Sequence, residues 1–145
     1  MKEYPPTKQC QICQKVCCKL LPGACVPEDL MRMYSGGTLE EAVNAALKSG
    51  RFSIDWYEGG LPSYFIRPAT KGKEGVVRDP SWGGICTFLT NKGCSLEFEK
   101  RPLICRALKP GKEANDICRT PSIKGSQKLF AANRWEDSEV NLGRI

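Results

Sequence analysis

Cys10-Gln11-Ile12-Cys13-Gln14-Lys15-Val16-Cys17-Cys18 places four thiols within nine residues of a polar N-terminal stretch. This density of thiols is typical of a metal site rather than of a hydrophobic core. If the segment is helical, Cys10, Cys13 and Cys17 lie at positions i, i+3 and i+7, so their sulfur atoms share one face and can converge on one ion. Cys18 then points elsewhere, which indicates a ligand of a second centre or a reactive thiol.

Four further cysteines in the last two-fifths of the chain supply ligands that would complete such a site: Cys86, Cys94, Cys105 and Cys118. A metal bound by both groups would join the N-terminus to the C-terminal half. The sequence contains no histidine. Mixed thiolate and imidazole sites, and any catalytic dyad that needs histidine, are therefore excluded.

The length of 145 residues fits one domain, residues 1–145, and the composition indicates a small α+β fold with much irregular structure. Apolar residues make up 41% of the chain, beside 14 glycines and 10 prolines. We expect short helices, a few short strands and a metal ligated by cysteine that staples them together.

The cysteines are expected to be reduced, because nothing in the sequence suggests export. No signal peptide and no apolar run of about 18 residues is visible, so we expect a cytoplasmic protein without a membrane span. Nine cysteines amount to about 6% of the chain, below the content of secreted disulfide scaffolds, and the count is odd. A disulfide scaffold is the less favoured alternative.

The formal charge of +6 is compatible with nucleic acid, but it counts every cysteine as neutral. Eight thiolates around two Zn²⁺ ions would lower the charge to about +2. Basic side chains close to the cysteines would favour metallation, unless they are ordinary solvated surface charges. They are Lys8, Lys15, Lys19, Lys92, Lys100, Arg101, Arg106 and Arg119.

Local patterns predict two helices and two strands in the first half of the chain. A helix begins near Pro27, and the capping box Thr38–Glu41 starts another, with apolar residues at helical spacing up to Gly50. Alternating residues predict strands around Phe52–Trp56 and Tyr64–Ile66. Cys25 precedes the first helix in an apolar context and suits a small buried residue as well as a ligand, so the expected site omits it.

The second half of the chain is predicted to be less regular. Residues 69–84 are rich in glycine, proline and charge and indicate a loop or lid. A strand over Ile85–Thr90 and a turn at Asn91–Gly93 follow. Pro102 suits the first position of a short helix that carries Cys105, and a C-terminal helix is expected over about residues 122–136.

These motifs together resemble the YkgJ-type cysteine-cluster family, which is described as a zinc- or iron-chelating domain. The resemblance rests on the Cys10–Cys18 motif and on three later stretches, Gly84–Leu89, Cys94–Phe98 and Arg101–Arg106. It implies metal ligands at Cys10, Cys13, Cys17, Cys18, Cys86, Cys94 and Cys105, with Cys118 a weaker match. Family members commonly carry an aromatic-Pro pair after the Cys-Arg, whereas this chain continues Ala107-Leu108-Lys109-Pro110.

Eight thiols permit two zinc sites, one 4Fe-4S iron-sulfur cluster with spare thiols, or one of each. The spacing of the N-terminal motif matches neither the common ferredoxin run nor the radical-initiating CxxxCxxC. We expect a structural or adaptor module with a protein partner. An iron-sulfur redox or protein-modification enzyme is the alternative, and a nucleic-acid-binding zinc protein is the third reading.

The sequence identifies no catalytic residue. Phosphate-cradling glycine motifs are absent. Asp55, Glu97, Glu99 and Asp116 show no spacing that marks an acid-base pair, and each is expected to be solvated on the surface.

Overall fold

Two antiparallel strands, β1 (Phe52–Tyr57) and β2 (Ser63–Pro68), lie at the centre of the computed structural model. The structure describes residues 22–34, 37–57, 63–81, 83–107 and 127–145. Ile54 stands opposite Ile66, and each faces an additional extended segment on its outer side. The backbone of Ile54 bonds residues 77 and 79, while the Ile66 carbonyl accepts the N–H of Cys25 at 2.7 Å. The strand pair is thereby widened on both edges.

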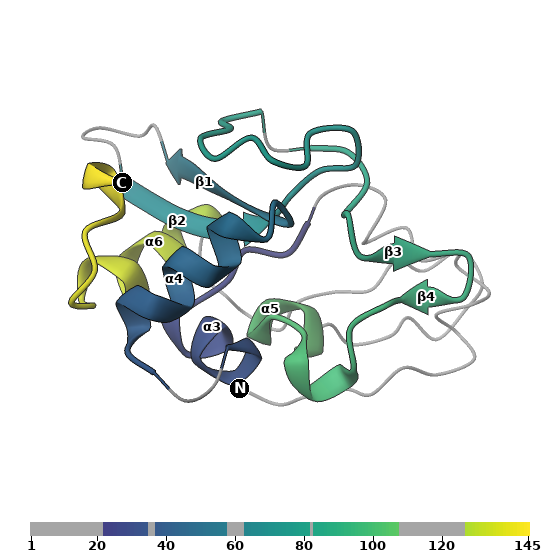
Figure 1. Cartoon of the computed structure of the whole chain (residues 1–145), viewed down its shortest axis with the longest axis horizontal. Helices are drawn as coiled ribbons and strands as arrows, with labels where there is room; N and C mark the ends of the chain where they lie inside the picture. Colours follow the sequence, from purple (N-terminus) through teal and green to yellow (C-terminus); the bar gives the residue numbers. More distant parts are fainter. Residues whose placement is uncertain (1–21, 35–36, 58–62, 82, 108–126) are drawn as a thin grey trace.

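Helices pack against this strand pair (Figure 1). The helix α3 (Pro27–Met33) contacts α4 (Leu39–Lys48), and α4 contacts β1, while α6 (Gln127–Glu136) touches both strands. The N-terminus of α4 is capped as its sequence predicts, because the Thr38 hydroxyl accepts the Glu41 N–H at 3.2 Å. None of the described helices is long and apolar enough to cross a membrane.

A small hairpin and two helical turns follow the central sheet in the sequence. The hairpin pairs β3 (Leu89–Thr90) with β4 (Gly93–Cys94) and extends to one side of the molecule in Figure 1. The 3₁₀ turn η1 (Phe98–Lys100) contacts α3 and leads into the short helix α5 (Leu103–Arg106). A second 3₁₀ turn, η2 (Leu142–Arg144), contacts β2 near the C-terminus.

Both faces of β1 are buried. Phe52 packs between the rings of Tyr34 and Phe88, with centroid distances of 6.3 and 5.5 Å. On the opposite face of β1, the Asp55 Oδ2 atom lies 3.0 Å from the Nε atom of Arg67 in β2, and both side chains are fully buried. The expectation that Asp55 is solvated is therefore wrong, because the segment that includes Asp79 covers this side and also binds Arg67.

The predicted α+β class is confirmed, as are the two helices and the strand pair of the first half. Two boundaries differ. The strand expected over residues 85–90 is reduced to Leu89–Thr90, because Cys86 instead bridges Thr70 beyond the end of β2. Pro102 is the N-cap of α5 rather than its first residue. The described part of the C-terminal helix begins at Gln127, and residues 122–126 lie outside the described residues.

Candidate metal centre

Cys86 lies where the backbone turns away from the central sheet into the hairpin. The N–H of Thr87 donates to the Ala69 carbonyl at 2.9 Å, and the Leu89 N–H donates to the Cys86 carbonyl at 3.0 Å. This turn directs the backbone N–H of Phe88 to the Cys86 sulfur as a hydrogen-bond donor. An N–H aimed at sulfur favours the thiolate form, which is the form that binds metals.

Cys94 is brought beside Cys86 by the hairpin. Leu89 pairs with Cys94, and the Ser95 N–H donates to the Phe88 carbonyl at 2.7 Å. Gly93 adopts a φ of +117°, a conformation that side chains disfavour, which lets the chain reverse directly before the cysteine. The two thiols are close enough for Cys94 to raise the pKa of Cys86. A turn between two cysteines is the arrangement that zinc sites use to bring thiolates together.

Cys105 lies on α5 and reaches toward the segment that precedes α3. A Cβ atom placed on Gly23 would lie 2.4 Å from the Cys105 sulfur, so the sulfur occupies space that only a glycine at position 23 leaves open. The cysteine is partly buried. The two segments in contact are thus about 80 residues apart in the sequence.

Cys25 is a fourth thiol in this region that the predicted ligand set does not include. It is fully buried, and its backbone is held by Ile66 and by the Trp135 indole, which donates to its carbonyl at 2.9 Å. Its thiol lies within electrostatic range of Cys105 and Cys86. The described thiols therefore form a series of neighbours, from Cys94 to Cys86, Cys25 and Cys105. The apolar sequence around Cys25 gives no signal of this proximity.

Burial keeps the Cys86 and Cys25 thiols protonated when no metal is bound. It raises the pKa of Cys86 to about 11, against the lowering effect of the Phe88 N–H, Arg51 and Lys71. Burial also raises the pKa of Cys25 well above its ordinary value, and the nearby Asp29 adds to the effect. A metal cation bound at Cys86 would replace the proton of that thiol, because coordination deprotonates a thiol outright.

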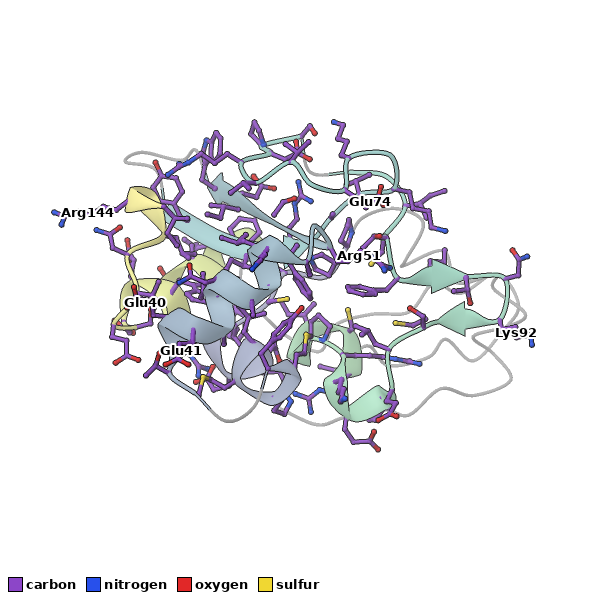
Figure 2. The ribbon with its side chains drawn as sticks, in the orientation of Figure 1. Glu40, Glu41, Arg51, Glu74, Lys92 and Arg144 are labelled. Atoms are coloured by element: carbon purple, nitrogen blue, oxygen red, sulfur yellow. The ribbon has the colours of Figure 1, made fainter. Side chains whose placement is uncertain are left out.

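Arg51 adds a cation and a clamp beside Cys86. Its side chain lies on the side of the molecule toward β3, near Glu74 (Figure 2). It binds Thr87, and its guanidinium carbon lies 4.5 Å from the centre of the Phe88 ring. The Thr87 hydroxyl donates to Glu74 at 2.9 Å. These contacts fix the two residues that follow Cys86.

An all-sulfur donor set fits zinc and iron, both of which bind thiolates in tetrahedral sites. Within the described part of the chain, no group of three or more cysteine and carboxylate side chains is close enough to hold an ion by itself. Cys25, Cys86 and Cys94 form no disulfide with any residue that the structure describes. The remaining predicted ligands lie outside the described residues; they are Cys10, Cys13, Cys17, Cys18 and Cys118.

Comparison with known proteins identifies the class of the protein. Residues 9–122 match a family, named for the pattern CxxCxxCC, that is described as "Putative zinc- or iron-chelating domain". The chain belongs to this family. Its own motif has three residues between Cys13 and Cys17, where the family's name has two. No curated protein and no solved structure matches the chain.

Proposed function

We propose that the chain is a thiolate metal-binding module in which zinc or iron joins the Cys10–Cys18 segment to Cys86, Cys94 and Cys105. One observation carries the proposal: thiols from separate segments gather in one largely buried region. Membership of the zinc- or iron-chelating family supports it independently. Cys118 is the proposed eighth ligand, which would allow one or two centres, including a 4Fe-4S cluster.

The described residues would hold the centre through charge and backbone geometry. The Phe88 N–H and the cations Arg51 and Lys71 favour the Cys86 thiolate. They would thereby offset part of the negative charge that accumulates when several thiolates share one divalent ion. When bound, the metal supplies a cross-link that contributes on the order of 10 kcal/mol to folding, and a cluster of iron would also carry electrons.

A structural or adaptor role fits the described thiols better than nucleophilic catalysis. A catalytic cysteine needs a lowered pKa and access for a substrate. Cys86 has the opposite properties, because it is buried and its pKa is raised to about 11. Cys25 is fully buried as well. We therefore propose that these side chains build a site and do not attack a substrate.

The identity of the metal decides between structural and redox roles. The full chain is purified without oxygen, its visible spectrum is recorded, and zinc, iron and sulfide are measured per chain. A colourless protein with stoichiometric zinc supports the structural module. A brown protein with iron and sulfide indicates a redox role, and a chain that binds neither metal refutes the proposal.

We further propose a protein partner and a reducing compartment such as the cytoplasm. Three aliphatic side chains upstream of β3 support the partner: Val76, Val77 and Ile85 are 43%, 40% and 41% exposed. A partner that co-purifies with the wild-type chain should be lost in the Val76→Ser/Val77→Ser variant while metal content is unchanged. A wild-type chain that purifies alone from its native extract, or a partner retained by the variant, contradicts this assignment.

A further inference from the structure

The Asp29 carboxylate connects the two segments that meet at Cys105. The side chain is fully buried in the first turn of α3. Its Oδ2 atom accepts the N–H of Val26 at 2.9 Å, directly after Cys25. Its Oδ1 atom accepts the N–H of Leu103 at 2.9 Å, in the first turn of α5. One carboxylate therefore fixes the backbone beside two cysteines.

Two arginines extend this connection into the turn before α5. Arg32 binds Asp29 and donates to the carbonyls of Glu99 and Arg101 at 3.1 and 3.2 Å. Arg106, the residue after Cys105, lies 3.7 Å from the Asp29 Oδ1 atom and donates to the same Arg101 carbonyl at 3.0 Å. The charged network thus holds both ends of the short helix that carries the thiol.

A helix of four residues has little stability of its own, so its orientation depends on such external contacts. At the same helix, the Cys105 sulfur is seated against Gly23, in the segment on which Val26 and Asp29 also lie. Gly23 packs directly against this sulfur. Asp29 fixes the sulfur indirectly, because it holds the backbone of α5 at Leu103.

We propose that Asp29 is a positioning residue of the metal centre, which acts by fixing the Cys105 sulfur without ligating the ion. This inference rests on the proposed function, because it takes Cys105 as a ligand. Groups that orient a ligand without touching the metal typically change its affinity about 10- to 100-fold when they are lost. The same range is expected for Asp29.

The test uses Co²⁺ titration of the full chain prepared without metal, with the thiolate-to-cobalt absorption as the signal. Asp29→Asn should weaken Co²⁺ binding about 10- to 100-fold and lower the absorption per bound ion. In the Asp29→Asn/Cys105→Ser variant, binding should be no weaker than in Cys105→Ser alone, because the two residues act through one ligand. Additive losses would overturn the inference.

Asp55→Asn is the matched control, since Asp55 is also fully buried and paired with an arginine at 3.0 Å, but on a strand without cysteine. Any change in Co²⁺ affinity caused by Asp55→Asn should add to the change caused by Cys105→Ser. An Asp29→Asn variant that binds Co²⁺ as well as Asp55→Asn does overturns the inference while the proposed function stands. A wild-type chain that binds no Co²⁺, zinc or iron overturns the proposed function itself.

Gly23→Ala keeps the inference testable if Asp29→Asn does not fold. Its added Cβ displaces the end of the Cys105 side chain, which can rotate, so circular dichroism should be unchanged while the cobalt absorption falls. Gly37→Ala is the control, because its Cβ would lie 2.5 Å from the flexible Glu41 carboxylate. Equal cobalt binding by these two variants would contradict the seating of Cys105 on Gly23.

Discussion

Arg51 binds Thr87 through two hydrogen bonds, from Nε to the hydroxyl oxygen at 2.9 Å and from a terminal nitrogen to the carbonyl oxygen at 3.0 Å. The forked geometry holds both the side chain and the backbone of the residue after Cys86. Lysine cannot reproduce it, since an ammonium group lacks the planar pair of donors. Arg51, which directly precedes β1, therefore helps to orient Cys86, a proposed metal ligand.

Arg51→Lys should weaken metal binding about tenfold, within the range expected for a group that orients a ligand. Lysine keeps the positive charge near Cys86. A loss of metal affinity therefore reports the loss of the two hydrogen bonds to Thr87. Competition with a chromophoric zinc chelator measures the change. Arg144→Lys is the control, because Arg144 is exposed at the end of the molecule opposite to the β3–β4 hairpin (Figure 2). Equal affinities for the two variants would contradict a role for the Arg51 clamp.

Cys25→Ala should leave the metal content unchanged and lower the free energy of unfolding by about 1 kcal/mol, because the change removes one buried atom from the core. Cys25 is fully buried among apolar side chains. Metal analysis per chain and urea denaturation provide the two readouts. If Cys25→Ala loses as much metal as Cys105→Ser, then Cys25 is a ligand and the predicted ligand set is incomplete.

Arg67→Met should lower the free energy of unfolding by about 3 to 5 kcal/mol, because it leaves buried carboxylates without their partner. Arg67 lies 3.0 Å from Asp55 and 3.3 Å from Asp79, and its own side chain is fully buried. Urea denaturation of the metal-free chain measures this change if that chain is folded. If it is not folded, urea denaturation of the metal-loaded chain measures the change. A loss below about 1 kcal/mol would show that this ion-pair cluster contributes little net stability.

Acid should destabilise the chain partly through Asp79. Burial alone raises the pKa of this carboxyl, but the hydroxyl and N–H of Ser81 and the nearby Arg67 outweigh it and hold the pKa below the ordinary 3.8. A lowered folded-state pKa contributes stability above the unfolded-state value, and this is lost as the pH falls through the folded-state value. Asp79→Asn should flatten the decline of unfolding free energy below about pH 4. If Asp79→Asn had the same pH dependence of unfolding free energy as the wild-type chain, Asp79 would not contribute to acid destabilisation.

Local rules predicted the elements whose stabilising contacts are short in sequence. Thr38 and Glu41 cap α4 through adjacent residues, and the apolar residues of α4 recur at helical spacing. The strand pair follows from alternation and from the break between the strands. The expectation that Asp55 is solvated was wrong, because no local pattern shows that residues 77–79 cover the outer positions of β1.

The sequence predicted that cysteines build the site, but it predicted less well which of these thiols lie close together. The turn at Asn91–Gly93 was predicted, and the hairpin built on it brings Cys94 beside Cys86. The proximity of Cys25 to Cys105 was not predicted, because Cys25 is positioned by pairing with Ile66 across 41 positions of sequence. The role of Asp29 likewise depends on a contact with Leu103 that no local pattern signals.

X-ray absorption at the metal edge of the freshly purified full chain shows whether one thiolate centre joins the two parts of the chain. We predict zinc or iron with sulfur neighbours only, at about 2.3 Å for zinc, and loss of sulfur neighbours or of the ion in both Cys13→Ser and Cys105→Ser. An ion surrounded by oxygen or nitrogen, or full sulfur coordination retained in either variant, would contradict a centre built from both parts of the chain.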